Sequence, residues 1–112
     1  MQIKEQMHGN VAVISLKGKL MGGPETLAIH EKIKELVGNN INKVVIDLGN
    51  VKWMNSSGLG ALMGSMTTLR NAGGELKLAK VTEKVQSLFM ITKLITIFET
   101  FDGVDQAVSS FN

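Results

Sequence analysis

Apolar and polar positions alternate along the first part of the chain, and this pattern predicts two adjacent strands. Residues 2–8 and 11–17 flank the pair Gly9-Asn10. A two-residue Gly-Asn loop between strand-like segments is typical of a β-hairpin. Both alternating sets of side chains in the second strand are largely apolar, which indicates a strand covered on both faces. Gly18 is expected to end this strand.

Two longer segments have the spacing of amphipathic helices. Residues 24–37 place apolar side chains three and four positions apart, and Pro24 suits a first helical position, where no amide hydrogen is needed. A second helix is expected to start at Ser56 or Ser57 and to bury one apolar stripe. The stripe consists of Leu59, Leu62, Met63, Met66 and Leu69.

The remaining elements are shorter and alternate in type. Residues 43–48, 75–81 and 95–101 have the composition of strands, and Thr82 and Asp102 are expected to cap two short helices. The order is therefore ββαβαβαβα. Strands separated by helices predict an α/β fold with a mostly parallel sheet of about five strands, an N-terminal antiparallel hairpin and about four helices.

Length and composition narrow the class of protein. A chain of 112 residues without a linker or repeat predicts one domain over residues 1–112. The absence of cysteine excludes disulfides and thiolate metal sites. The twelve basic residues are scattered singly and nearly balanced by ten acidic ones, and aromatics make up 4%, so we expect no nucleic-acid partner. No apolar run reaches membrane-spanning length, and the first residues lack a signal-peptide core, so we expect a cytoplasmic protein without a membrane partner.

Motifs for catalysis are missing from the sequence. His8 and His30 have no carboxylate cluster at metal-ligand spacing, and neither a nucleophile elbow nor a phosphate-binding glycine loop is present. We therefore expect no enzyme activity, no catalytic residue, no metal and no cofactor. Asp47 is expected to bond loop amides at the end of its strand, and Trp53 is expected to pack under the loop that follows. The alternative for Trp53 is a contact with a partner, since tryptophan is enriched at interfaces.

Three lysines lie in or next to predicted loops. Lys17, Lys19 and Lys52 are expected to be solvated, although together they would form a local basic rim.

Two hydroxyls stand where the second helix begins, at Ser56 and Ser57. In the plainer interpretation a serine caps the helix by accepting a hydrogen bond from a free amide. In the other, the helix start is a site for an anion or a phosphate, since its amides and dipole favour negative charge. Spacing alone leaves both open.

The segment VVIDLGNVKWMNSSGLGAL, residues 44–62, resembles the signature of bacterial anti-sigma factor antagonists, which are STAS domains. In that family a hydrophobic strand and a short loop precede Asp-Ser-Ser-Gly-Leu-Gly at a helix start. Gly18-Lys19-Leu20, Glu25-Thr26-Leu27 and Gly73-Gly74-Glu75-Leu76 match further family positions in order. The likeness covers essentially the whole chain and implies a STAS fold.

The resemblance implies a regulatory binding module in bacterial signalling and transcription. An antagonist of this family binds an anti-sigma factor, commonly a serine kinase of the GHKL type, and so frees a sigma factor. The kinase phosphorylates the antagonist and breaks the complex, and a metal-dependent serine phosphatase of the PP2C type reverses this. We expect the protein to be a monomer or weak dimer.

Residue by residue, the resemblance implies that Ser56 is the phosphate acceptor. The partner-binding loops would contain Met21, Gly22, Asn55, Ser56, Ser57, Gly58, Leu59 and Gly60.

Two positions depart from the family pattern. Asn55 and Met21 stand where the family has aspartates, so the surroundings of Ser56 carry less negative charge. One alternative is therefore a STAS scaffold that binds a protein partner in a signalling complex without phosphorylation. Another, from a different class, is a small enzyme or ligand-binding domain that uses the helix start as an anion site, which would require a pocket with convergent polar groups.

Overall fold

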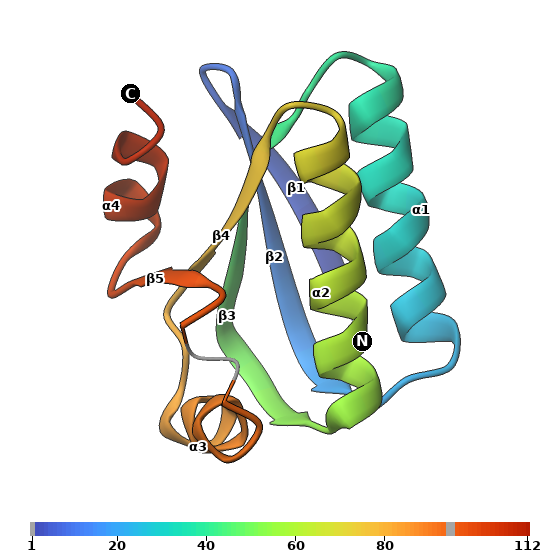
Figure 1. Cartoon of the computed structure of the whole chain (residues 1–112), viewed down its shortest axis with the longest axis vertical. Helices are drawn as coiled ribbons and strands as arrows, with labels where there is room; N and C mark the ends of the chain where they lie inside the picture. The colour runs from blue at the N-terminus through green and yellow to red at the C-terminus, as the bar shows by residue number, and fades with distance from the viewer. Residues whose placement is uncertain (1, 94–95) are drawn as a thin grey trace.

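A computed structural model describes residues 2–93 and 96–112 as one mixed sheet with four helices among those residues (Figure 1). The sheet order is β1-β2-β3-β4-β5; β1 pairs with β2 antiparallel and the other neighbours are parallel. The strands are β1 Gln2–His8, β2 Val11–Leu20, β3 Lys43–Met54, β4 Glu75–Ala79 and β5 Glu99–Phe101. The helices are α1 Pro24–Gly38, α2 Ser56–Asn71, α3 Glu83–Ile91 and α4 Val104–Ser109. The predicted α/β fold and order of elements are confirmed.

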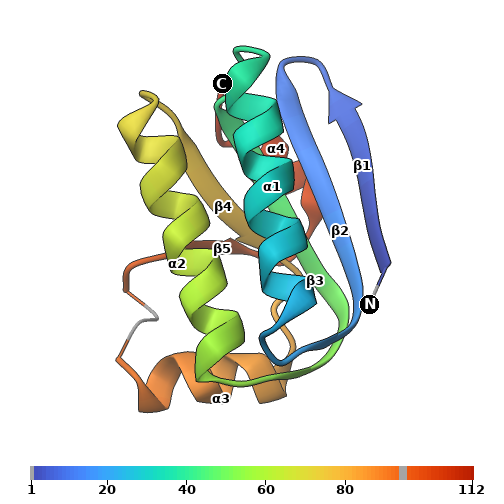
Figure 2. The same ribbon diagram turned by 90° about the vertical axis from the view of Figure 1, so that its right-hand side faces the viewer.

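Helices α1 and α2 lie side by side over one face of the sheet (Figures 1 and 2). Their apolar stripes and the inward side chains of β2, β3 and β4 form the main core. In the predicted stripe of α2, Leu59, Leu62, Met66 and Leu69 are buried and Met63 is half-buried. Burial of this stripe, at roughly 25 cal/mol per Å² of apolar area, anchors α2 on the sheet.

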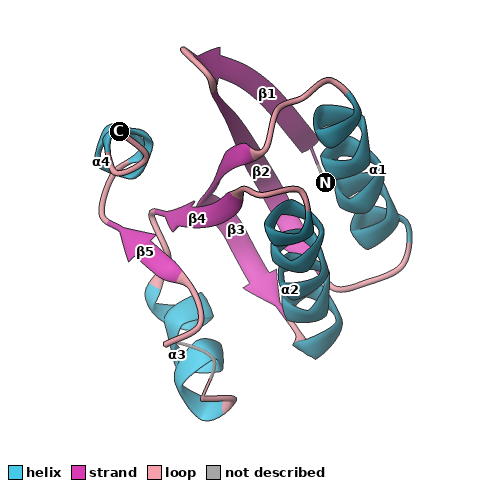
Figure 3. Ribbon diagram, turned by 45° about the horizontal axis from the view of Figure 1, so that its top comes forward, coloured by secondary structure: helices cyan, strands magenta, loops and turns pink. Residues whose placement is uncertain are grey.

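Helix α4 covers part of the opposite face of the sheet (Figure 3). Ala107 packs there on Val13, Val45 and Ala79. The first part of β2 is thus covered on both faces, as its apolar pattern predicts. Helix α3 lies toward the other end of the sheet in Figure 1. At that end, α4 does not cover the outer face of β2 and β3.

The edge strand β1 is held to α1 by an ion pair. The ammonium of Lys32 lies 3.1 Å from a carboxylate oxygen of Glu5 and 3.5 Å from one of Glu35. The hydrogen bond to Glu5 raises the pKa of Lys32 above its ordinary value. This ion pair connects the edge strand to the helix layer.

Strands β2 and β3 are both longer than predicted. Gly18 was expected to end β2, and β3 was expected to end at residue 48. Instead the two strands pair as far as Leu20 and Met54, with register shifts around Lys17 and Gly18. Gly18 has a φ of 119°, which a side chain would resist, so it allows a bulge within the strand rather than ending it.

The last strand and two helix caps also differ from the predictions. The segment 95–101 contributes only β5 to the sheet, and residue 95 lies outside the described residues. Phe98 leaves the strand path because its ring stacks on Phe89 of α3, with centroids 5.5 Å apart. Helix α4 has Gly103 rather than Asp102 at its N-cap. Thr82 is the N-cap residue of α3, but its side chain makes no capping hydrogen bond.

Candidate partner-docking site

The site lies where β3 ends and α2 begins. Asn55 is the N-cap residue of α2, and its side-chain oxygen accepts a hydrogen bond from the amide of Gly58 at 3.0 Å. The interpretation in which a serine caps this helix is therefore wrong, because the cap is Asn55. The helix does begin at Ser56, as predicted. The side chains of Ser56 and Ser57 are both exposed.

Asn55 also joins the helix start to the loop between β2 and α1. Its side-chain amide donates a hydrogen bond to the carbonyl oxygen of Met21 at 2.9 Å, and its backbone amide donates to the carbonyl of Leu20 at 3.3 Å. An aspartate could make the cap but could not donate to Met21. The two positions that depart from the family pattern are thus in direct contact.

Glycines allow the loop and the helix to approach each other closely. A Cβ added at Gly58 would collide with the carbonyl oxygen of Leu20. Gly22 has a φ of 103°, and a Cβ added there would lie 3.0 Å from the Cβ of Ser57. Gly60 is different, because an added Cβ would meet nothing within 4 Å. The fold therefore requires glycine at 58 and 22, but not at 60.

The predicted site residues divide by exposure. Met21, Ser56, Ser57 and Gly60 are exposed and surround the start of α2. Gly22 and Asn55 are half-buried, and Gly58 and Leu59 are buried. The first group can touch another molecule directly, whereas the second holds the loop and the helix in place. Helix α2 has no acidic residue in its first turn.

The sequence predicts that Trp53 packs under the loop, and this prediction is wrong. Trp53 is 50% exposed, and the ammonium of Lys84 lies 4.1 Å from its ring centroid. Lys84 carried no signal in the sequence, because only the fold brings the start of α3 beside β3. Asp47, in contrast, behaves as predicted: its carboxylate accepts a hydrogen bond from the amide of Gly49 at 2.9 Å.

Within residues 2–93 and 96–112, no group of three or more potential metal-ligating side chains comes together. In the same part of the chain, no helix has the length and apolar character needed to span a bilayer.

The family model described as "STAS domain" matches residues 2–107, so this chain belongs to the STAS domain family. The anti-sigma F factor antagonist of Paenibacillus polymyxa is 25% identical over 109 residues, which are 97% of this chain and 93% of that protein. The anti-sigma-B factor antagonist of Staphylococcus aureus is 26% identical over 77 residues, 69% of this chain and 71% of that protein.

Solved structures share the fold. An anti-sigma factor antagonist from Mycobacterium paratuberculosis superimposes with a TM-score of 0.81 at 23% identity, over 97% of this chain and 92% of that one. The Bacillus cell fate determinant SpoIIAA in its phosphorylated form gives 0.77 at 19% identity, over 99% of this chain and 100% of that one. Its unphosphorylated form gives 0.75 at 19% identity, over 97% and 96%. The five-stranded STAS fold predicted from the sequence is confirmed.

Proposed function

We propose that the protein is an anti-sigma factor antagonist that binds an anti-sigma factor through the start of α2, and that phosphorylation of Ser56 ends this binding. The observation that carries the proposal is that Asn55, and not Ser56, caps the helix. Asn55 caps the helix, so the exposed hydroxyl of Ser56 has no capping role to lose on modification. The names of the two bacterial relatives support the same function.

The proposed docking surface consists of Met21, Ser56, Ser57 and Gly60, and Gly22, Asn55, Gly58 and Leu59 hold it in shape. A phosphate on Ser56 brings about −1.5 to −2 charges to this surface. A charge left unpaired in an interface costs about 2–5 kcal/mol. That corresponds to roughly 30- to several-thousand-fold in affinity, which is enough for a switch without a change of fold.

The partner in this proposal is an anti-sigma factor that is also a GHKL-type serine kinase, and a PP2C-type phosphatase restores the active form. The two SpoIIAA structures show that the STAS fold exists in a phosphorylated and an unphosphorylated form in that protein. The helix start suits a phosphate here as well, because the amides and dipole at the first turn of α2 favour negative charge.

The proposal is tested by binding measurements on two pairs of variants. The partner is captured from the native organism, identified by mass spectrometry and titrated calorimetrically. We expect Ser56→Ala to bind whether or not ATP is present, and Ser56→Asp to bind at least about 30-fold more weakly. Ser109→Ala and Ser109→Asp, at an exposed serine of α4 away from the docking surface, are the matched controls. If both Ser56 variants bind like the wild type, the switch is contradicted.

A second candidate function rests on the hydrogen bond between Asn55 and Met21. This contact stands where the family has two acidic residues, so the site lacks carboxylates that a kinase would meet. The protein would then be a STAS scaffold that binds its partner without modification. In that case Asn55→Asp leaves partner binding unchanged and gains no phosphate, whereas a newly gained kinase response would show that Asn55 disables a switch.

A further inference from the structure

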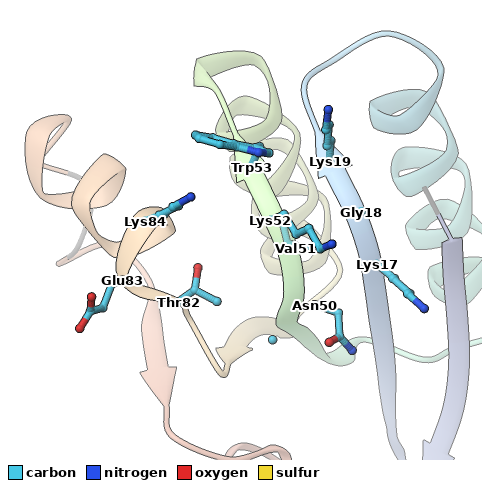
Figure 4. A pocket seen from close by; sticks show the side chains of 11 residues that line it. Lys17, Gly18, Lys19, Asn50, Val51, Lys52, Trp53, Thr82, Glu83 and Lys84 are labelled. Carbon is cyan, nitrogen blue, oxygen red and sulfur yellow. The ribbon is translucent and has the colours of Figure 1, made fainter.

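A hollow of about 820 Å³ lies on the outer face of β2 and β3, next to the start of α3 (Figure 4). We call it the basic groove and define it by Trp53 and four lysines around it. The lysines are Lys17, Lys19, Lys52 and Lys84. They come from three elements, since β2 provides two, β3 one and α3 one, as Figure 4 shows.

Charge in the basic groove is strongly one-sided. It holds four of the twelve basic residues of the chain, whereas Glu83 is the one acidic residue among those that line the hollow. Within the described residues, none of the four lysines has a carboxylate oxygen within 4.0 Å, although other lysines of the chain do. The positive electrostatic field of these lysines is therefore directed at solvent and favours an anionic occupant.

Trp53 provides an apolar contact surface among these lysines. Half of the side chain is exposed, and Lys84 lies against its ring. Tryptophan is enriched among residues that dominate binding energy, because it offers a large rigid apolar area. A purely inorganic anion would leave this ring unused. The combination fits an occupant with several carboxylates and an apolar side chain.

The basic groove lies close to the docking surface around Ser56 along the chain. Trp53 is three residues before Ser56, so their Cα atoms are at most about 11 Å apart. Lys19 is two residues before Met21, which lies on the same docking surface. A protein that covers the start of α2 can therefore also reach the groove.

We propose that the basic groove binds an acidic segment of the partner protein, a stretch of Asp and Glu residues with one apolar side chain that packs on Trp53. This inference rests on the proposed function and specifies the chemistry of the partner.

The chain contains one tryptophan, so its intrinsic fluorescence reports on the basic groove alone. We would titrate the intact protein with a synthetic Asp/Glu peptide carrying one central Phe or Leu. We expect saturable binding that weakens as salt is raised. Lys19→Gln/Lys52→Gln should weaken it about tenfold, whereas Lys34→Gln/Lys43→Gln, with the same charge change elsewhere, should leave it within about twofold.

Several results would overturn the inference. These are no saturable binding of the acidic peptide, equal loss in both double variants, or equal binding of a Lys-rich peptide. Binding of inorganic phosphate that the peptide cannot displace would point instead to a small-anion site.

The same variants separate this inference from the proposed function. If the captured partner is lost on Ser56→Asp but binds the Lys19→Gln/Lys52→Gln protein at full strength, the groove proposal fails and the switch stands. If the partner is indifferent to Ser56 but lost with the lysine pair, the switch fails and the groove stands.

Discussion

Asn55 links the two loops that surround Ser56. Its side-chain oxygen caps α2 through Gly58, and its side-chain amide holds the carbonyl of Met21. Both bonds are formed by one planar amide, which is both donor and acceptor. The residue therefore fixes the helix start and the neighbouring loop at once, and leaves the hydroxyl of Ser56 free.

The first prediction concerns the stability provided by Asn55. We expect Asn55→Ala to lower the free energy of unfolding by about 1–2 kcal/mol, because it removes the cap and the bond to Met21. Asn55→Asp should cost less, since a carboxylate keeps the cap and suits the helix dipole but cannot donate to the Met21 carbonyl. Urea unfolding of the three proteins checks this, and an alanine variant as stable as the wild type would contradict it.

The sequence could not separate these two roles at the residue scale. Serine and asparagine are about equally good caps, so a run of Asn55, Ser56 and Ser57 leaves the cap position undecided. The resemblance to the family selected Ser56 as the acceptor. The contact between Asn55 and Met21 joins residues 34 positions apart, and only the folded chain shows it.

At the scale of elements, the end of β2 and the start of α2 form one unit. Gly58 packs directly on the carbonyl of Leu20, and this contact sets the distance between helix and strand. Gly60 lies on the exposed side of the same turn, and a Cβ added there would meet nothing within 4 Å. Two glycines of one motif therefore have different reasons to be present.

The second prediction follows from this difference. Gly58→Ala should lower the free energy of unfolding by about 1–3 kcal/mol, because the new methyl overlaps the Leu20 carbonyl and pushes α2 outward. Gly60→Ala is the matched control and should raise stability by about 0.5–1 kcal/mol through helix propensity. We also expect Gly60→Ala to weaken partner binding, since it alters the docking surface. Equal thermal stability of the two variants would refute the argument.

The order of elements could be predicted from periodicity, but several boundaries could not. Gly18 and Gly49 interrupt the apolar pattern and indicate strand ends. In the structure the interrupted segments pair with each other, and Val51, which pairs with Gly18, is buried. This pairing depends on residues more than 30 positions apart. Phe98 likewise leaves the strand pattern because of a contact with α3.

On the scale of the whole molecule, the proposed functions gather at one end of the sheet. The parallel strands β2 and β3 end beside the start of α2, and α3 borders the same end (Figure 1). Ligand sites of α/β folds commonly lie at the carboxyl ends of such strands. The opposite end, with the hairpin turn at Gly9 and Asn10, has none of the candidate residues.

The third prediction separates fold from binding. Ser56→Asp places a negative charge at the first residue of α2, where the helix dipole stabilises it by about 0.3–1 kcal/mol. We therefore expect a melting temperature equal to or a few degrees above that of the wild type, together with the loss of partner binding proposed above. A clear fall in melting temperature would mean that the charge acts by damaging the fold.

The site could be predicted in part at this scale. The motif residues do lie together around the start of α2, and the resemblance identified the family. The basic groove was visible only as three separate lysines, Lys17, Lys19 and Lys52. Its fourth lysine, Lys84, and the exposure of Trp53 depend on the placement of α3, which no local pattern encodes.

The most direct test of the central claim is mass spectrometry of this protein isolated from its native cells under growth and stress conditions. Phosphate should be mapped residue by residue across α2 and the loop before it. The account predicts a phosphopeptide with the modification on Ser56, in a fraction that changes with conditions. A protein that carries no phosphate on Ser56 in any condition, while still bound to its partner, would contradict it.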